Sequence, residues 1–365
     1  MDSVNRLLLE QLQSLLAQDS ESRCLLIADE SFDTNSLAKL KYPQLHLLSM
    51  RFDTHSAALE AGIHSHFADM KLEQSNQHFN HVFFRVSKER LVSHRAINIS
   101  DKVLLTHAQL HVFGRKDDGI KSYVDKTKKQ LGFSGNLKKD GEAYSATLTK
   151  LAHTGSKALD DANYPELRLI KELEILGSSY QLFSKPGVFG WKKVDTGSQF
   201  LIDTLIQEKD NAKTRLINID EHSKALDLGC GSGHLSFALH ALGFKQLVAS
   251  DNNSAALLAC EQNFTVNKFK QEGFNYQCKA GDAALNIKDE FDFIICNPPF
   301  HKGKDHSLDL TAHFAKAISL RLKKTGQAWL VCNSFVGMEK KLQYEGLKVE
   351  NINNNGSFKV LKAHF

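Results

Sequence analysis

A short apolar segment followed at once by three alternating glycines constrains the fold of this 365-residue chain more than any other feature. Residues 224–239 read K-A-L-D-L-G-C-G-S-G-H-L-S-F-A-L, with the glycines at Gly229, Gly231 and Gly233. The apolar segment predicts a strand that ends before the first glycine, and the pattern from His234 onward predicts a helix. Glycines between the two let the backbone turn sharply and let a ligand approach closely, and the free N–H groups of a helix start favour anionic groups.

Two carboxylates accompany this loop. Asp227 lies within the predicted strand, and Asp251 follows 24 residues later, at the end of the next predicted strand. A carboxylate at that place can accept hydrogen bonds from both hydroxyls of a ribose. The dinucleotide-binding pattern G-x-G-x-x-G requires a third glycine where this chain has His234. The pattern D-x-G-x-G-x-G is instead similar to the S-adenosylmethionine loop of the class I methyltransferases.

A second motif ends another predicted strand. The apolar segment Phe291–Cys296 runs directly into Asn297, Pro298, Pro299 and Phe300. Two successive prolines fix the backbone and remove two N–H donors, so their carbonyl groups stay available as acceptors. The side-chain oxygen of Asn297 and the carbonyl of Pro298 can then accept both hydrogens of an exocyclic amino group. Phe300 can stack on a planar base, so these three residues are the predicted catalytic residues.

The N-P-P-F motif resembles that of methyltransferases acting on exocyclic or amide nitrogens, and the chain further resembles the bacterial ribosomal RNA small subunit methyltransferase C family. The stretches that carry this similarity are P-G-V-F (186–189), D-T-G-S-Q (195–199), N-P-P-F-H (297–301), S-L-D (307–309) and S-F-K-V (357–360). The resemblance implies an α/β protein of two tandem class I methyltransferase domains with mainly parallel seven-stranded sheets. It implies a degenerate first domain at residues 1–175, with a structural or RNA-binding role, and a catalytic domain at residues 176–365.

The resemblance also implies an activity. The enzyme is expected to transfer a methyl group from S-adenosylmethionine, without a metal, to N2 of a guanine in 16S rRNA, within the 30S subunit or an assembly intermediate. S-adenosylhomocysteine would be the second product. The implied cofactor-binding residues are Asp227, Gly229, Gly231, Gly233, Asp251, Asn252, Asp282 and Ala283. An acidic residue at the position of Asp282 accepts the amino group of adenine in these families.

Other functions remain open from the sequence. The sister 23S rRNA guanine-N2 methyltransferases share N-P-P-F-H, and protein-glutamine N5-methyltransferases use N-P-P on a side-chain amide. A non-enzymatic RNA-binding assembly factor is a third alternative, although the intact loop and Asn297 argue against it. A nicotinamide oxidoreductase is disfavoured by His234 and leaves the N-P-P motif unexplained.

Short apolar segments alternate with helix-length segments in both halves, which predicts two sets of βαβ units. The predicted strands are Cys24–Ala28, Leu45–Ser49, His81–Val86, Leu110–Phe113, Lys224–Leu228, Gln246–Ser250, Phe291–Cys296 and Ala328–Cys332. Residues 53–59 match residues 251–257 at five of seven positions, 198 residues apart, and this offset also aligns Asp29 with Asp227. We interpret the match as a duplicated domain whose first copy lost its glycine loop.

Composition limits the remaining choices. Hydrophobic residues make up 42% and charged residues 24%, which excludes a mostly disordered chain, and the net charge of +4 permits an anionic partner. No apolar run approaches the ~18 residues that a membrane span needs, and no secretory signal is recognisable. The six cysteines form no C-x-x-C pair, as expected for reduced thiols. We therefore expect a cytoplasmic monomer.

Candidate phosphate contacts are Lys192, Lys193, Lys302 and Lys304, with a second group at Lys126, Lys128, Lys129, Lys138 and Lys139.

Overall fold

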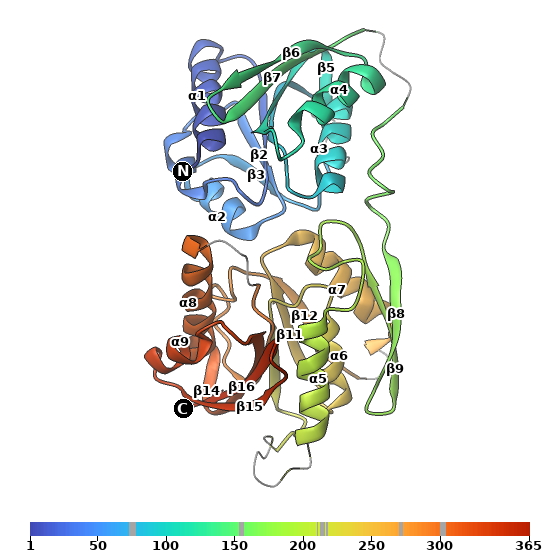
Figure 1. Cartoon of the computed structure of the whole chain (residues 1–365), viewed down its shortest axis with the longest axis vertical. Coiled ribbons are helices and arrows are strands. Elements are labelled where there is room, and N and C mark those ends of the chain that lie inside the picture. Colours follow the sequence, from blue (N-terminus) through green and yellow to red (C-terminus); the bar gives the residue numbers. More distant parts are fainter. Residues whose placement is uncertain are drawn as a thin grey trace. The chain divides into compact units, whose positions relative to one another are not determined.

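The computed structural model describes residues 1–72, 78–152, 157–209, 211, 216, 218–269, 273–299 and 304–365, without the side chains of 304–309. The chain divides into two compact units, Met1–Glu166 and Leu167–Phe365 (Figure 1). Each unit contains a mixed, mostly parallel sheet of seven described strands. The expected architecture of two tandem α/β domains with seven-stranded sheets is therefore confirmed.

The first unit orders its strands β3-β2-β1-β4-β5-β7-β6. The strands β1 to β5 pair in parallel, and β7 is antiparallel to both β5 and β6. The strands are β1 (Cys24–Ala28), β2 (Leu45–Ser49), β3 (His64–Phe67), β4 (Phe79–Arg85), β5 (Leu104–Arg115), β6 (Phe133–Asp140) and β7 (Ala143–Lys150). The helices are α1 (Ser3–Gln18), the 3-10 helix η1 (Thr34–Lys39), α2 (Phe52–Glu60), α3 (Arg90–Val103) and α4 (Ile120–Leu131).

The second unit orders its strands β12-β11-β10-β13-β14-β16-β15, and a separate hairpin pairs β8 with β9. The strands are β8 (Arg168–Ile175), β9 (Ser178–Ser184), β10 (Lys224–Leu228), β11 (Gln246–Asp251), β12 (Asn275–Ala280), β13 (Phe291–Cys296), β14 (Leu322–Asn333), β15 (Lys348–Asn354) and β16 (Phe358–His364). The helices are α5 (Thr196–Glu208), α6 (His234–Ala241), α7 (Ser254–Val266), α8 (Lys304–Arg321) and α9 (Met338–Tyr344). None of the helices formed by described residues combines the length and apolarity that a bilayer crossing needs.

The two sheets have the same topology, with β1 at the place of β10 and β2 at the place of β11. This confirms the predicted duplication, but the short sequence repeat that suggested it has the wrong register. Asp53 lies inside helix α2, whereas Asp251 is the last residue of β11. Asp29 follows the end of β1, whereas Asp227 lies within β10. The repeat therefore matches residues of similar type that lie at different structural positions. Which positions are equivalent in the two sheets depends on how the strands pair, and a match of side-chain types does not show this.

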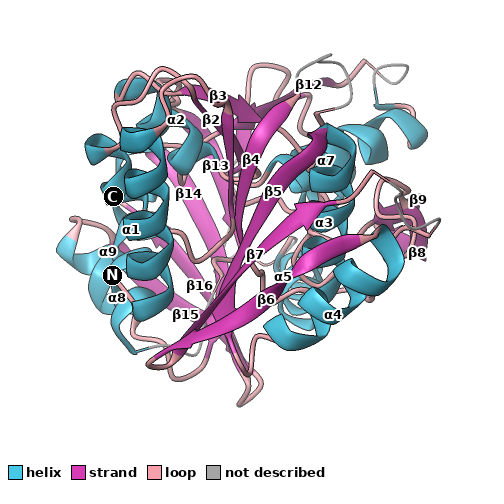
Figure 2. Cartoon of the chain, turned by 90° about the horizontal axis from the view of Figure 1, so that it is seen from above, coloured by secondary structure: helices cyan, strands magenta, loops and turns pink. Residues whose placement is uncertain are grey.

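Apolar side chains alternate between two cores on opposite faces of the second sheet. Leu226 and Ile294 belong to the core that α8 and α9 cover. Ala225 and Phe293 belong to the core on the other face, with side chains from α5, α6 and α7. Figure 2 shows helices on both sides of the strands. Strands covered on both faces must be apolar almost throughout, which is why short continuous apolar runs predicted them correctly.

In the first unit, an ion-pair cluster lies at the carboxyl ends of β1 and β4. Asp2 caps α1 by accepting from the N–H of Asn5, and its Oδ2 lies 2.7 Å from Nη2 of Arg85. Nε of Arg85 lies 3.7 Å from Oδ2 of the buried Asp29. Burial raises the pKa of Asp29 to about 8, against the smaller opposing effect of Arg85. Polar and charged side chains thus occupy the edge of the first sheet that is equivalent to the edge with the glycine loop in the second sheet.

Candidate active site

Four neighbouring parallel strands of the second unit end at one edge of the sheet. Leu228, the last residue of β10, pairs with Ser250 of β11 and with Cys296 of β13. Asp251 at the end of β11 pairs with Ala280 at the end of β12. Ligands of open α/β sheets bind in the crevice outside such carboxyl ends. The predicted loop and polar motifs, which follow these strand ends, therefore meet at one site.

Two of the three glycines in the loop, Gly231 and Gly233, have different roles. Gly229, Gly231 and Gly233 all have positive φ, at 76°, 53° and 86°, a conformation that side chains rarely adopt. A Cβ on Gly231 would enter open space, whereas a Cβ on Gly233 would lie 2.9 Å from Sγ of Cys260. Gly233 thus allows α6 to pack closely on α7. Gly231 leaves room above the loop, where a bound ligand would contact the bare backbone.

Asp251 closes the loop onto the neighbouring strand. The N–H of Gly231 donates to Oδ2 of Asp251 at 2.8 Å, and the N–H of Asn253 donates to Oδ1 at 2.8 Å. Burial raises the pKa of Asp251, and these hydrogen bonds, with a further one from Asn252, oppose that shift. Each carboxylate oxygen has two lone-pair positions, and the residue is only partly buried. Asp251 can therefore still accept the hydroxyls that the sequence predicted for it.

Asp227 is fully buried beneath the loop. The hydroxyl of Ser236 donates to its Oδ2 at 2.6 Å, and no described residue donates to its Oδ1. Burial raises the pKa of Asp227 to about 7, and the nearby charge of Asp251 adds to that effect. A buried carboxylate with one unpartnered oxygen favours a donor or cation supplied from outside the protein. Together with the open space at Gly231, this fits a cofactor that carries an ammonium group.

The turn after β12 holds Asp282 and Ala283, the predicted contacts for adenine. Ala283 and Ala284 have φ values of 45° and 55°, so two successive non-glycine residues occupy the left-handed region. Strain of this kind is concentrated at ligand sites. Oδ2 of Asp282 lies 3.0 Å from Nε2 of His313 on α8, and this contact raises the pKa of His313. The Asp282 side chain is 42% exposed, so it can still accept from a ligand.

Asn297 follows directly after β13, and its amide is held by residues from helix α5. Nδ2 of Asn297 donates to Oδ2 of Asp195 at 2.8 Å and to Oγ of Ser198 at 2.9 Å. Pro298 is buried. Phe300, the third predicted catalytic residue, lies outside the described residues, as do residues 301–303. The motif thus presents an oriented amide at the same sheet edge as the glycine loop.

The second unit matches the description "Methyltransferase small domain" over residues 179–362, which is half of the chain. The match includes the glycine loop and the strand ends described above. The chain belongs to the methyltransferase small domain family. In the structure, the matched residues begin within β9 and end within β16, so β8 lies outside the match.

Known proteins are similar to this chain beyond the methyltransferase small domain. Ribosomal RNA small subunit methyltransferase C of Shewanella pealeana (strain ATCC 700345 / ANG-SQ1) is 27% identical over 365 residues, covering 93% of this chain and 97% of that protein. Its namesake in Marinomonas sp. (strain MWYL1) is 26% identical over 278 residues, 74% of each chain. The T. thermophilus 16S rRNA N2 G1207 methyltransferase, solved with AdoMet and guanosine, has a TM-score of 0.78 at 22% identity. That structural match covers 100% of this chain and 92% of the other. The resemblance to the small subunit methyltransferase C family is therefore confirmed.

The sequence missed three residues of the methyltransferase small domain site. Asp195 and Ser198 lay in a stretch that carried the resemblance, but their sequence gave them no role. The pattern D-T-G-S does indicate a helix N-cap, which Asp195 forms for α5 by accepting from the N–H of Ser198. His313 had no sequence signal, because its partner lies on a distant turn.

His234 is buried at the start of α6, where no described residue contacts its ring nitrogens by a hydrogen bond and burial lowers its pKa to about 4.

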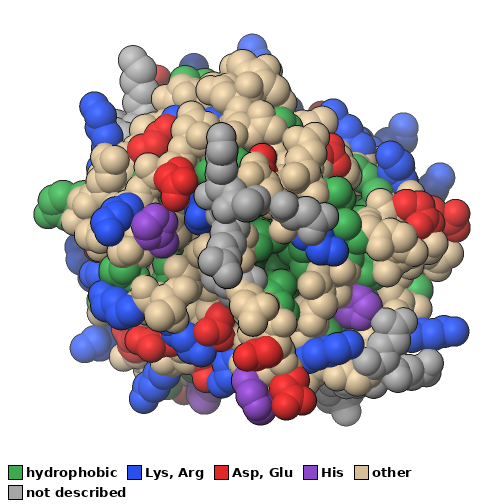
Figure 3. Space-filling view, turned by 90° about the horizontal axis from the view of Figure 1, so that it is seen from below, with side chains coloured by type: hydrophobic (Ala, Val, Ile, Leu, Met, Phe, Trp, Pro, Cys, Tyr) green, Lys and Arg blue, Asp and Glu red, His purple; other side chains and the backbone are tan. Residues whose placement is uncertain are grey.

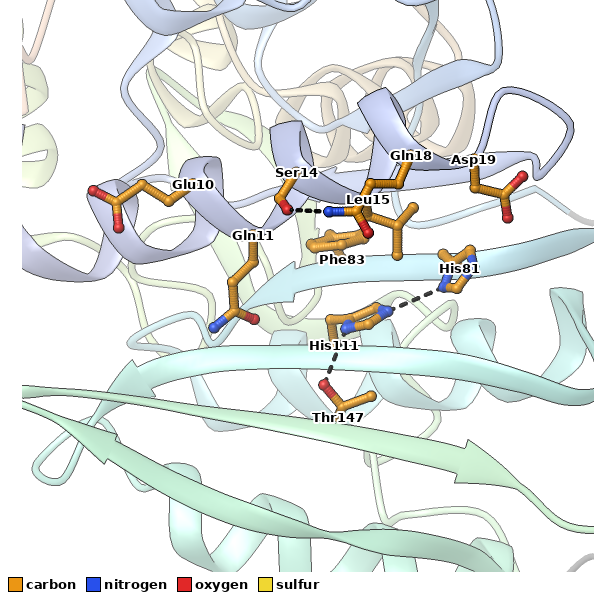
Figure 4. A pocket seen from close by; sticks show the side chains of 10 residues that line it. All are labelled: Glu10, Gln11, Ser14, Leu15, Gln18, Asp19, His81, Phe83, His111 and Thr147. Carbon is orange, nitrogen blue, oxygen red and sulfur yellow. Dashed lines mark hydrogen bonds between the residues drawn. The ribbon is translucent and has the colours of Figure 1, made fainter.

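Outside the methyltransferase small domain, the first unit has a groove of about 490 Å³ between α1 and its sheet (Figure 4). Nε2 of His111 lies 3.1 Å from Nδ1 of His81, and Nδ1 of His111 lies 3.2 Å from Oγ of Thr147. Burial lowers the pKa of His111 to about 3, so this chain of contacts is neutral. The lining residues are Glu10, Gln11, Ser14, Leu15, Gln18, Asp19, His81, Phe83, His111 and Thr147. They come from α1 and the middle of the sheet, not from the carboxyl edge that forms the site in the second unit.

Proposed function

We propose that this protein transfers a methyl group from S-adenosylmethionine to N2 of a guanine in 16S rRNA. The observation that carries the proposal is the oriented amide of Asn297 beside the glycine loop. Asp195 accepts from the amide nitrogen, so the amide oxygen is left to accept from a substrate amino group. The names of the Shewanella and Marinomonas relatives support small-subunit rRNA as the substrate class.

The cofactor would be held by the residues predicted for it. Asp251 would accept the ribose hydroxyls, Asp227 would balance the ammonium group, and Asp282 with Ala283 would contact the adenine. The loop glycines and Asn252 would complete the site. S-adenosylmethionine bound there supplies an electrophilic methyl group, whose bond to sulfur breaks with its electron pair as the acceptor nitrogen bonds to it.

The acceptor in the proposed reaction, the amino nitrogen of guanine, is a weak nucleophile. The lone pair of a guanine amino nitrogen is delocalised into the ring. Acceptance of its two hydrogens by Oδ1 of Asn297 and the carbonyl of Pro298 draws that nitrogen toward tetrahedral geometry and aims its lone pair. Correct alignment contributes up to about 7–11 kcal/mol toward lowering the barrier. The nitrogen becomes acidic once methylated, so its proton can leave to water without a dedicated base. Phe300 is proposed to stack on the base.

A surface loop beside the site suits an RNA substrate. Phe189 is 75% exposed, although its neighbour Val188 is buried and Nδ2 of Asn253 donates to the carbonyl of Gly187 at 2.7 Å. The adjacent Lys192 and Lys193 are exposed. An exposed aromatic ring with cations on an anchored loop can stack on a base and bind its phosphates. On the face that Figure 3 draws, basic and acidic side chains are interspersed.

The proposed reaction places requirements on the RNA substrate and on the rest of the protein. A guanine inside paired RNA cannot reach Asn297 at the sheet edge, so the substrate must present it unpaired or flipped out, as a 30S subunit or assembly intermediate could. The proposed ribosomal RNA substrate implies action in the cytoplasm, and we propose that the protein acts as a monomer. The first unit, with its ion-pair cluster at the equivalent sheet edge, is proposed to stabilise the second unit and to extend the RNA-binding surface. Lys302 and the side chain of Lys304 lie outside the described residues.

The test is to incubate the purified protein with labelled S-adenosylmethionine and, separately, 30S subunits, 50S subunits and naked 16S rRNA from cells that lack the enzyme. Digestion then identifies the labelled nucleoside, with Asn297→Ala assayed alongside. We expect N2-methylguanosine in 16S rRNA and a greatly reduced, still measurable amount of it with the variant. Label in 23S rRNA would move the substrate to the large subunit, and label in protein would indicate a glutamine methyltransferase. Binding of cofactor without any labelled product would overturn the enzymatic proposal.

A further inference from the structure

We propose that Asp195, assisted by Ser198, is the positioning residue that sets which end of the Asn297 amide faces the substrate. This inference rests on the proposed function and adds a specific role for the start of helix α5. Asp195 and Asn297 are 102 residues apart in the sequence and meet at the sheet edge of the site.

The chemistry of the contact leaves one orientation of the amide. A carboxylate has only acceptors, so the atom of Asn297 that faces Asp195 must be the donor Nδ2. That contact is 2.8 Å long, and the second hydrogen of Nδ2 is taken by Oγ of Ser198 at 2.9 Å. Both hydrogens of the amide are thereby used. The oxygen Oδ1, to which no described residue donates, is left as the acceptor for a substrate amino group.

Asp195 is itself held rigidly. Its Oδ2 accepts from the N–H of Ser198 at 2.7 Å, which makes it the N-cap of α5. Gly197 lies tightly between this carboxylate and an aromatic ring, because a Cβ there would lie 3.2 Å from Oδ2 of Asp195 and 3.2 Å from Cε1 of Phe358. The cap, the glycine and Phe358 come from two of the stretches that carried the family resemblance. They form one support for Asn297.

The charge of Asp195 contributes as well as its geometry. A carboxylate that accepts from an amide N–H polarises the amide, and its oxygen becomes a stronger acceptor. The substrate nitrogen gains positive charge as it bonds to the methyl group, so its N–H groups become stronger donors in the transition state. An interaction that strengthens in the transition state raises kcat more than it lowers KM. Loss of Asp195 should therefore reduce kcat.

Two substitutions separate this role from helix capping. Asp195→Asn keeps the size and a cap oxygen but lets the Asn297 amide rotate by 180°. Asp195→Ser keeps a good N-cap but is too short to reach Asn297. We expect both variants to lose about 10²-fold in kcat toward the RNA, as expected for one misplaced transition-state contact. The dissociation constant for S-adenosylhomocysteine, measured by calorimetry, and the midpoint of thermal unfolding should stay close to wild type.

Asp203→Asn is the matched control, because it removes the same charge from the exposed face of the same helix. It should keep wild-type kcat. Ser198→Ala leaves the backbone N–H that Asp195 caps and should give a smaller loss of kcat than the Asp195 variants.

A double-mutant cycle with Asn297→Ala supplies the decisive readout. If Asp195 acts through Asn297, Asp195→Asn causes no further loss of kcat in the Asn297→Ala background. Wild-type kcat in both Asp195 variants, or an undiminished second loss in the cycle, would overturn the inference while the proposed function stands. Absence of RNA methylation by the wild-type protein would instead overturn the proposed function. Unfolding of both Asp195 variants, with wild-type kcat in Ser198→Ala, would show that Asp195 is a structural cap and overturn the inference.

Discussion

The backbone N–H of Gly231 donates a hydrogen bond to Oδ2 of Asp251 at 2.8 Å, which ties the glycine loop after β10 to the end of β11. The loop is therefore closed by a side chain from the next strand. The same carboxylate is the predicted partner of the cofactor ribose, so the ordering of the loop and the binding of cofactor depend on one residue. Substitutions in the loop can therefore affect both cofactor affinity and folding stability.

Alanine substitutions should separate the loop glycines. Gly231→Ala places a methyl group in the open space above the loop, so we expect cofactor affinity to fall at least tenfold. The positive φ costs about 1–2 kcal/mol of stability. Gly233→Ala adds an overlap with Sγ of Cys260 and should destabilise the fold by about 1–3 kcal/mol more. Gly243→Ala is the control, because Gly243 also has positive φ and open space but lies after α6. Calorimetry and thermal unfolding measure both effects, and equal cofactor affinity in Gly231→Ala and Gly243→Ala would contradict the prediction.

Asp227 should make the stability of the free protein depend on pH. Its pKa is raised to about 7 by burial, whereas the ordinary value is 3.8, so between these pH values the folded state binds more protons than the unfolded state. The free energy of unfolding should therefore fall as pH rises from about 4 to 7. Asp227→Asn should remove this slope and stabilise the free protein at pH 8 by about 1–3 kcal/mol.

The same substitution should weaken cofactor binding, because the charge that balances the ammonium group is lost. Urea unfolding at several pH values and calorimetry with S-adenosylhomocysteine provide the two measurements. A variant with the wild-type pH slope would show that another group titrates in this range.

Asn263 should contribute strongly to the folding stability of the methyltransferase small domain. Its fully buried amide accepts from the N–H of Phe183 at 2.8 Å and donates to the carbonyls of Phe183 and Ser232 at 2.8 and 2.7 Å. It thus joins strand β9, helix α7 and the glycine loop. Asn263→Ala should destabilise the fold by about 3 kcal/mol or more, because buried backbone groups lose their partners.

Asn267→Ala is the matched control for that substitution. Asn267 bonds Gln181 of β9 in the same way but is only partly buried, so water can replace its amide. Asn267→Ala should lower the free energy of unfolding, measured with urea, clearly less than Asn263→Ala does. Similar losses in the two variants would mean that burial does not govern the contribution of these amides.

The loop around Phe189 should contribute to RNA affinity and not to cofactor affinity. Phe189→Ala should weaken RNA binding by about 1–3 kcal/mol if the exposed ring stacks on a base. Substitution of both Lys192 and Lys193 by glutamine should reduce the salt dependence of binding by about one counterion per lost phosphate contact. Filter binding of 16S rRNA at several salt concentrations measures both. Wild-type RNA affinity in all variants would place the RNA elsewhere on the molecule.

Much of the architecture followed from local patterns. Apolar runs such as Lys224–Leu228 and Phe291–Cys296 coincide with β10 and β13, because strands covered on both faces leave few polar positions. The helix predicted from His234 onward is α6. Such local patterns did not predict which residues of the two domains occupy equivalent positions. That equivalence depends on backbone pairing between strands, which a short match of side-chain types does not report.

The sequence by itself therefore determined the glycine loop, the N-P-P motif and the order of elements that brings them to one sheet edge. These features are local, since each depends on residues next to one another and on the rule that parallel strands end together. Only the tertiary structure decided that Asp195 holds the amide of Asn297 and that His313 approaches Asp282. Only it decided that Asp227 is buried with a raised pKa. Hydrogen bonds and desolvation depend on atoms that are distant in the chain and close in space, and packing alone brings those atoms together.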